Sequence, residues 1–117
     1  MKILINASNL VKGGSLQVAV SFIIEAEHRK LDSFYALSLE VYNQLTYSGV
    51  TLASSKFIIF ENSPSTSINS RKALLSYSRN VSPDLVFTIF GPSYVKFESL
   101  HVTGFADGWV THSNLLV

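Results

Sequence analysis

Apolar and polar residues follow one another in blocks that predict strands and helices in alternation. Residues 3–5 are apolar throughout, which is typical of a strand buried on both faces of a parallel sheet. Beyond Gly14 the apolar residues recur at helical spacing, and Ser15 is the expected N-cap. The apolar positions of this helix are Leu16, Ala19, Val20, Ile23 and Ile24. The chain therefore opens with a strand, a glycine turn and a helix.

The alternation continues to the end of the chain. Further strands are expected at 33–40, 56–61, 82–91 and 101–105, and further helices at 41–49 and 68–80. This order predicts one α/β domain over 1–117, a three-layer, Rossmann-like, doubly wound and mostly parallel sheet in the order 3-2-1-4-5. Nine residues are too few for a crossover helix before the fifth strand, so that strand either follows an extended loop or pairs differently.

In this strand order the first and fourth strands are neighbours where the winding reverses. Ligands of such sheets bind at the carboxyl ends of those two strands. Here the ends are residues 9–14 and 91–94. Topology thus predicts that the two glycine-containing loops lie at one site.

The pair Gly13-Gly14 has two interpretations. "KGGS" matches neither the dinucleotide fingerprint nor the phosphate loop of nucleotide-binding proteins. It can be a tight turn that needs a positive φ. Alternatively, it can bring backbone amides and the start of a helix close to an anionic or hydroxyl-rich ligand. The residues alone leave both open.

The amino-acid composition limits the kinds of partner that the chain is expected to bind. Charged residues make up only 15% of the chain and apolar residues 47%, against about 25% charged in ordinary domains. We therefore expect another domain or chain to cover part of the surface. The net charge of +1 gives no argument for nucleic-acid binding, and the absence of cysteine excludes disulfides and thiolate metal sites.

The chain is also expected to be cytoplasmic. It carries neither a signal-peptide pattern nor an apolar run of about 18 residues. Arg71, Lys72 and Arg79 follow one helix and could touch anionic lipid at the inner face of a membrane. Three cations are too few to favour lipid binding, and a solvated helix face explains them better.

Two stretches carry a family resemblance: "MKILINASNLVKGGSLQVAVSFI" and "SPDLVFTIFGPSYVKFESLHVTGFADGW". Over residues 1–110 they resemble the N-terminal domain of GT-B fold glycosyltransferases of the group called family four (glycosyl transferases group 1). The resemblance implies transfer of a sugar from a nucleotide-sugar donor to a glycan, lipid or other hydroxyl acceptor, as in polysaccharide or glycoconjugate biosynthesis. It implies no cofactor, since the nucleotide-sugar is a substrate, and it implies no metal.

The resemblance also implies substrate contacts. By position, Gly13 and Gly14 match the loop whose amides approach the donor phosphate, with Ser15 beside them. Ser93 and Tyr94 would line the adjacent acceptor cleft.

One catalytic candidate lies at a position where this chain differs from the family pattern. Family members often carry a histidine near the place of "GFAD", where this chain has Asp107. An aspartate there could hydrogen-bond a sugar hydroxyl or act as general base. An Asp-Gly turn explains the same residue equally well, and His112 is the alternative if the alignment slips.

The chain also differs from the family in the parts that these 117 residues do not contain. The second domain of the family, with its E-x(7)-E signature, is not in these 117 residues. We therefore expect an incomplete acceptor-side domain that does not turn over alone. Its expected partners are the C-terminal domain and, through an exposed sheet edge, a second copy. The alternatives are a flavodoxin-like binding module without catalysis, for which "VKGGS" is a poor phosphate loop, and a purely structural piece.

Overall fold

The structure is a computed structural model that describes residues 1–11, 13–89, 93–105 and 108–112, with only the backbone at 105 and 108–112. Its strands are β1 (Lys2–Ala7), β2 (Asp32–Ser38), β3 (Phe57–Phe60), β4 (Leu85–Ile89), β5 (Leu100–Phe105) and β6 (Gly108–His112). Its helices are α1 (Gly14–His28), α2 (Leu39–Tyr47) and α3 (Ile68–Val81), with a short 3-10 turn η1 (Ser54–Lys56) before β3.

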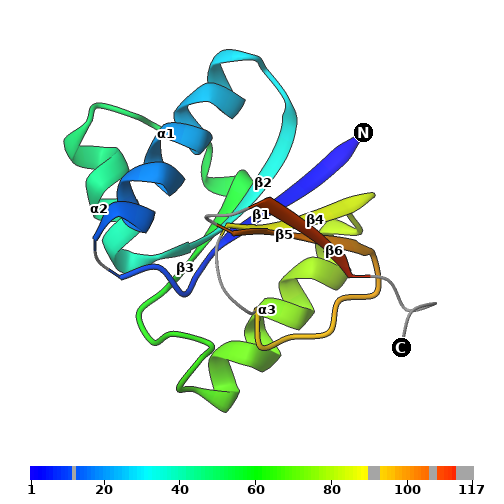
Figure 1. The fold of residues 1–117 in the computed structure, drawn as a ribbon. Coiled ribbons are helices and arrows are strands. Elements are labelled where there is room, and N and C mark those ends of the chain that lie inside the picture. The colour runs from blue at the N-terminus through cyan, green and yellow to red at the C-terminus, as the bar shows by residue number, and fades with distance from the viewer. Residues whose placement is uncertain (12, 90–92, 106–107, 113–117) are drawn as a thin grey trace.

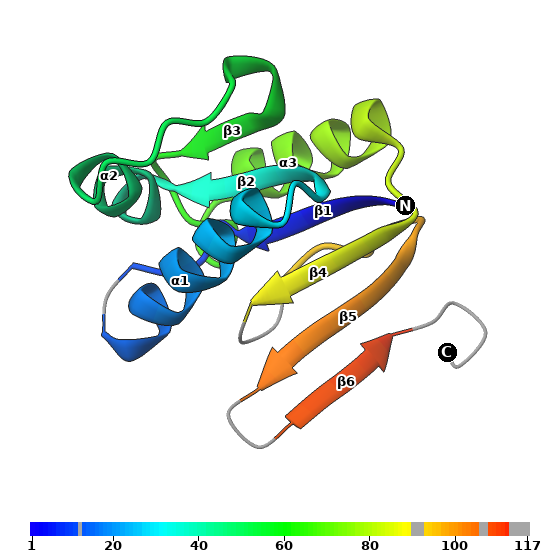
Figure 2. The same ribbon diagram turned by 90° about the horizontal axis from the view of Figure 1, so that it is seen from above.

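One sheet in the order β3-β2-β1-β4-β5-β6 forms the centre of the molecule (Figure 2). The first five of these strands are parallel, and β6 runs antiparallel to β5. The predicted α/β fold and the order 3-2-1-4-5 are therefore confirmed. β1 lies between β2 and β4, with Ile5 opposite Tyr35 on one side and Phe87 on the other.

The three predicted layers are present. Helices α1 and α2 cover one face of the sheet, and α3 covers the other (Figure 1). Each face has its own buried cluster, because successive strand residues point to opposite sides. The α1/α2 cluster contains Ile5, Ala7, Val20, Ile23, Tyr35, Leu37, Leu45 and Phe87. The α3 cluster contains Leu4, Ala36, Phe60, Leu74, Val86 and Phe97.

The boundary between β2 and α2 differs from the prediction. The Ser38 hydroxyl accepts a hydrogen bond from the Val41 N–H (3.1 Å), which makes Ser38 an N-cap. The strand therefore ends there, and Leu39 and Glu40 begin the helix instead of ending the strand. Gly49 follows the helix with a positive φ of 84°, as expected of a glycine that stops one.

The structure decides between the two paths considered for the short connection from β4 to β5, an extended loop or a different strand pairing. β5 pairs with β4 in parallel, and the described part of the connection, residues 93–99, contains no helix. Phe97 covers the part of the sheet that a crossover helix would otherwise cover. It is buried against Leu74 and Val86. Its ring lies edge-on to that of His101, with the ring centroids 4.9 Å apart. An irregular segment thus covers this part of the α3 face. Phe87 and Phe97 are core residues, as predicted.

Strand β6 was not predicted. Trp109 lies within β6, opposite Gly104 of β5. The sheet is therefore mostly, not wholly, parallel.

Candidate functional site

The turn between β1 and α1 is built around Gly13. Its φ of 81° and ψ of −163° lie in a region that is essentially restricted to glycine, so the conformational interpretation of this residue holds. Gly13 is also the N-cap of α1, and its carbonyl accepts from the Leu16 N–H. The prediction that Ser15 caps the helix is wrong, because the helix begins one residue before it. A Cβ on Gly14 would meet nothing within 4 Å, so packing does not require glycine there.

Side chains tie this turn to its neighbours on both sides. The Asn9 Oδ1 accepts from the Ser65 N–H (2.9 Å) and from the Ser63 hydroxyl, both in the loop between β3 and α3. On the other side, the Ser38 hydroxyl donates to the Leu10 carbonyl. Three loops at the carboxyl ends of β1, β2 and β3 are thus joined by short side chains.

Ser93 and Tyr94 form the fourth element of this edge. Ser93 is buried, and its hydroxyl donates to the Val95 carbonyl (2.8 Å) and accepts from the Val95 N–H (3.3 Å). That tight local turn leaves Tyr94 between them in the left-handed region, at φ 63°. Such a φ is unusual for a bulky residue, and strained backbone of this kind concentrates at functional sites. Tyr94 is 48% exposed.

Arg71 joins Tyr94 to the rest of the edge. It lies in the first turn of α3, where its Nε donates to the Pro64 carbonyl (2.7 Å) and its Nη2 to the Ser65 carbonyl (3.2 Å). Its guanidinium carbon is 5.6 Å from the centroid of the Tyr94 ring. We call residues 8–11, 13–15, 61–67, 71 and 93–95 the carboxyl edge.

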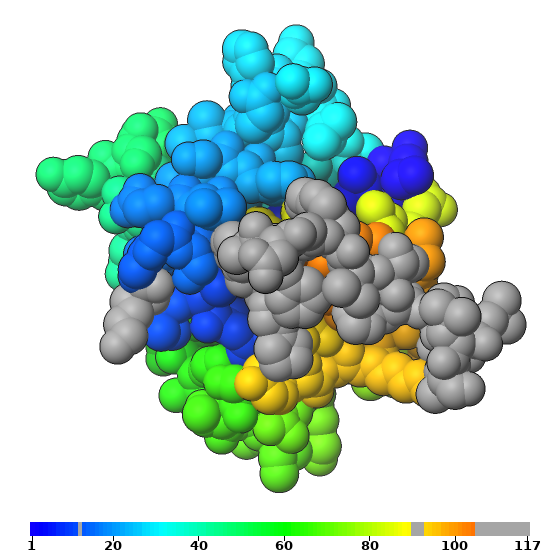
Figure 3. Space-filling model, viewed as in Figure 1, coloured from blue at the N-terminus to red at the C-terminus, as the bar shows by residue number. Residues whose placement is uncertain are grey.

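The visible face of the molecule shows how these segments meet. The end of β1 and the start of α1 in blue, the β3–α3 segment in green and residues 93–99 in yellow to orange adjoin one another (Figure 3). The predicted substrate residues are thus at one edge of the sheet. They come from opposite faces of it: Gly13, Gly14 and Ser15 begin α1, while Ser93 and Tyr94 are on the α3 side.

A buried polar chain lies behind this edge. Asn6 Oδ1 accepts from the Ser8 hydroxyl (2.6 Å), and Asn6 Nδ2 donates to the Thr88 Oγ1 (3.2 Å). The same Thr88 oxygen is 2.6 Å from His101 Nε2. The polar residues thus cross from β1 through β4 to β5 within the core. His101 is a buried, hydrogen-bonded histidine of the core.

Asn9, Arg71 and this polar chain were missed as site residues. Asparagines directly after the apolar run 3–5 were a signal in the sequence, since an amide there must find partners at the strand end. Arg71 was considered as a lipid contact or as part of a solvated helix face, and the second interpretation was favoured. Asp107 lies outside the described residues, and the side chain of His112, in β6, is not described.

The described groups with displaced pKa values lie elsewhere. Burial raises the pKa of Tyr77 to about 12, and burial with the Glu27 carboxylate raises that of Tyr35. The Arg29 guanidinium lowers the pKa of Glu25 on the surface of α1. Within the described part of the chain, no group of three or more His, Asp or Glu side chains could hold a metal. The described residues of the carboxyl edge offer hydroxyl, amide and guanidinium groups and the exposed carboxylate of Glu61.

A shallow, mainly apolar hollow adjoins the start of α1. It is lined by Gln17, Val18, Ser21 and Phe22, and Val18 is exposed although apolar. Among the helices that the structure describes, none is both long and apolar enough to cross a bilayer.

Comparisons with known proteins do not extend this picture. The chain matches no family model, no curated protein and no solved structure. The resemblance to GT-B glycosyltransferases therefore stays a prediction.

Proposed function

We propose that the chain forms the acceptor-side half of a nucleotide-sugar-dependent glycosyltransferase, with the carboxyl edge as one wall of its cleft. One observation carries the proposal: Gly13 and Tyr94, two residues in strained or glycine-only backbone, end up at the winding reversal between β1 and β4. This is where doubly wound sheets bind their ligands. The GT-B resemblance identified the same two loops from the sequence.

The chemistry of the edge supports this proposal. Sugars are recognised by hydroxyl and amide hydrogen bonds and by contact with aromatic rings. Asn9, Ser63, Ser65 and Tyr94 supply such groups within one continuous edge. The hollow along α1 supplies apolar surface next to it. We assign this half to binding and orienting the acceptor, and the donor nucleotide to a second wall.

The test is an amide NMR titration of the 117-residue chain. UDP-glucose, GDP-mannose, a neutral methyl glucoside and FMN are added separately. The proposal expects sugar-bearing ligands to shift the amides of residues 8–16 and 93–95, and FMN to leave those of residues 8–16 unshifted. Gly14→Ala is the matched control for Gly13→Ala, since only Gly13 needs a positive φ. Gly13→Ala should weaken binding while Gly14→Ala retains it.

Two results would refute this proposal. Saturable FMN binding at residues 8–16 would favour the flavodoxin-like module. Sugar-induced shifts confined to another surface, or absent at millimolar ligand, would remove the carboxyl edge as a sugar site.

A further inference from the structure

Arg71 has N–H donors that form no hydrogen bond with any described residue. A guanidinium has five N–H groups. Two of them donate to the Pro64 and Ser65 carbonyls. Three remain without a hydrogen bond to any described residue. Since the two bonds fix the side chain, these three donors are held in place before a ligand arrives.

The charge of Arg71 is also uncompensated among the described residues. The ion pairs found there join Arg29 to Glu25, Lys56 to Asp32 and Arg79 to Glu98. Arg71 is half-buried, and its partners are two neutral carbonyls and an aromatic ring. A half-buried cation without a carboxylate attracts an anion strongly, because partial burial reduces screening. Lys72, next to Arg71 in the sequence, and Lys96, two residues after Tyr94, are exposed, and Glu61 is the exposed acid at the start of the loop.

Tyr94 adds an apolar surface to this cation. The Ser93 turn holds its backbone in the left-handed region, and the guanidinium of Arg71 stacks near the ring. The ring remains about half exposed. A strained residue that keeps a large side chain partly in solvent gains little for stability, which points to a role in binding.

We propose that Arg71 and Tyr94 bind a sugar that carries an anionic group. The carboxylate or phosphate accepts from the free N–H groups of Arg71 in the two-point geometry that guanidinium favours. The sugar ring packs on the exposed part of Tyr94. This inference rests on the proposed function, of which it specifies the acceptor: a uronic acid or a sugar phosphate.

The experiment titrates the 117-residue chain with four probes. They are methyl β-D-glucuronide, the neutral methyl β-D-glucoside, glucose 1-phosphate and inorganic phosphate. Amide shifts at 65, 71 and 93–95 report the site. We expect the glucuronide to bind at least about tenfold more tightly than the glucoside, because it gains a charged hydrogen-bonded pair. Of the two sources, the tighter of glucuronide and glucose 1-phosphate identifies the natural anion.

Variants separate the two parts of the site. Arg71→Gln should reduce the preference for glucuronide over glucoside to about twofold or less. Arg79→Gln is the matched control on the same helix, since Arg79 is already paired with Glu98, and it should leave the preference intact. Tyr94→Asn keeps a residue that tolerates the left-handed region, and should weaken both sugars but not inorganic phosphate.

Arg71 also anchors the loop before α3, so Arg71→Gln could disturb folding. A second measurement needs no variant: raising the salt concentration should weaken glucuronide binding to the wild-type chain and leave glucoside binding unchanged. Equal binding of the two sugars, or equal salt dependence, overturns the inference. Inorganic phosphate binding as tightly as glucose 1-phosphate overturns the sugar part.

The two proposals fail separately. Nucleotide-sugar shifts at 8–16 without discrimination between glucuronide and glucoside would overturn only the anionic acceptor. Discrimination at 71 and 94 without sugar-induced shifts at 8–16 would leave an acidic-sugar site and overturn the proposed transferase cleft, of which the β1–α1 turn is part.

Discussion

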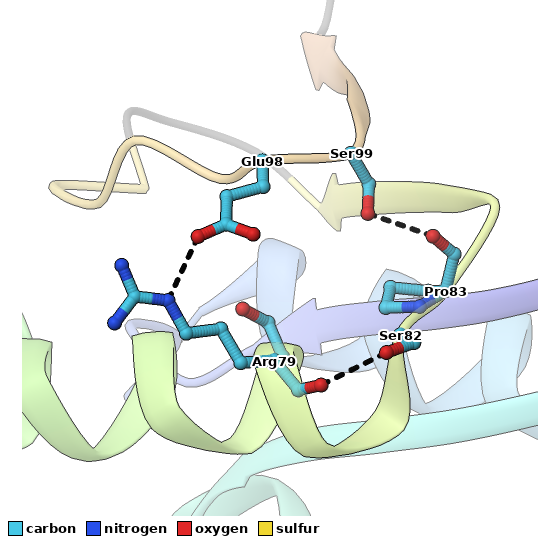
Figure 4. A pocket seen from close by; sticks show the side chains of 6 residues that line it. Arg79, Ser82, Pro83, Glu98 and Ser99 are labelled. Atoms are coloured by element: carbon cyan, nitrogen blue, oxygen red, sulfur yellow. Dashed lines mark hydrogen bonds and ion pairs between the residues drawn. The ribbon is translucent and has the colours of Figure 1, made fainter.

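The amino edge of the sheet, where the parallel strands begin, and the carboxyl edge differ in how their charged side chains are paired. At the amino edge, Asp84 accepts from the Lys2 backbone N–H (2.8 Å) and its own N–H donates to the Lys2 carbonyl (2.8 Å). The Lys2 ammonium donates to the Val81 carbonyl, where α3 ends. A small pocket of about 190 Å³ lies beside it, crossed by the Arg79–Glu98 ion pair (2.9 Å) and by the bond from Ser99 to the Pro83 carbonyl (Figure 4). Each of these polar groups has a partner within this edge.

The carboxyl edge leaves polar groups in excess. Arg71 has no carboxylate among the described residues, Asn9 Nδ2 is buried without a described partner, and Tyr94 is held in a strained backbone. Both edges belong to the same helix α3 and the same strands, so the fold does not impose the difference. Stability alone would favour the amino-edge arrangement, and our proposal of a ligand at the carboxyl edge accounts for the difference.

The largest expected effect concerns the polar chain behind the carboxyl edge. Thr88→Val keeps the shape of the side chain but removes the oxygen shared by Asn6 and His101. Two buried polar groups then lose a partner, and we expect a loss of about 2–4 kcal/mol in the free energy of unfolding. Urea denaturation monitored by circular dichroism measures it.

Thr103→Val is the matched control for that change. Thr103 lies opposite Thr88 in the sheet and is equally buried, but its hydroxyl has no described partner. The same substitution there should be neutral or slightly stabilising. Equal losses at the two positions would mean that the cost comes from packing and not from the polar chain.

The next effect separates the two glycines. Gly13→Ala forces an L-residue into φ 81° and ψ −163°, and should cost about 1–3 kcal/mol. Gly14→Ala should be neutral or stabilise by up to about 1 kcal/mol, since alanine suits a helix and nothing blocks its Cβ. Equal costs in urea denaturation would contradict the assignment of Gly13 as the conformational glycine.

A smaller effect is expected at two residues with positive φ. Lys30, at the end of α1, has φ 56° and is exposed, so Lys30→Gly should stabilise by about 1 kcal/mol. Tyr94→Gly gains the same backbone relief but loses the contact with Arg71, which is worth about 0.5–1 kcal/mol. Tyr94→Gly should therefore leave the stability nearly unchanged and abolish sugar binding. A full stabilisation by Tyr94→Gly would show that the ring adds nothing to the folded state.

Sequence patterns predicted the frame of the molecule well. The apolar run at 3–5, the helical spacing after Gly14 and the Pro-Asp before β4 each depend on local rules, and the order of the elements then follows from handedness. The position predicted for the site, at 9–14 and 91–94, also follows from strand order.

The side-chain contacts of the site could not be predicted in this way. Arg71 and Tyr94 are 23 positions apart in the sequence, and only the packing of α3 against residues 93–97 brings them together. Asn9 likewise meets Ser65 across two loops. Strand β6 was missed because a short antiparallel return depends on pairing with β5, and no periodicity of its own reveals it.

The smallest expected effect lies at the amino edge. Glu98→Gln removes the partner of Arg79, but both side chains are largely exposed, so solvent already screens the pair. We expect less than about 0.5 kcal/mol, disappearing at high salt. Arg71→Gln should have a larger effect on sugar binding than on stability, whereas Glu98→Gln should leave binding unchanged. If Glu98→Gln altered glucuronide binding as strongly as Arg71→Gln does, then the cations of α3 would act as one field, and the contrast between the two edges would be lost.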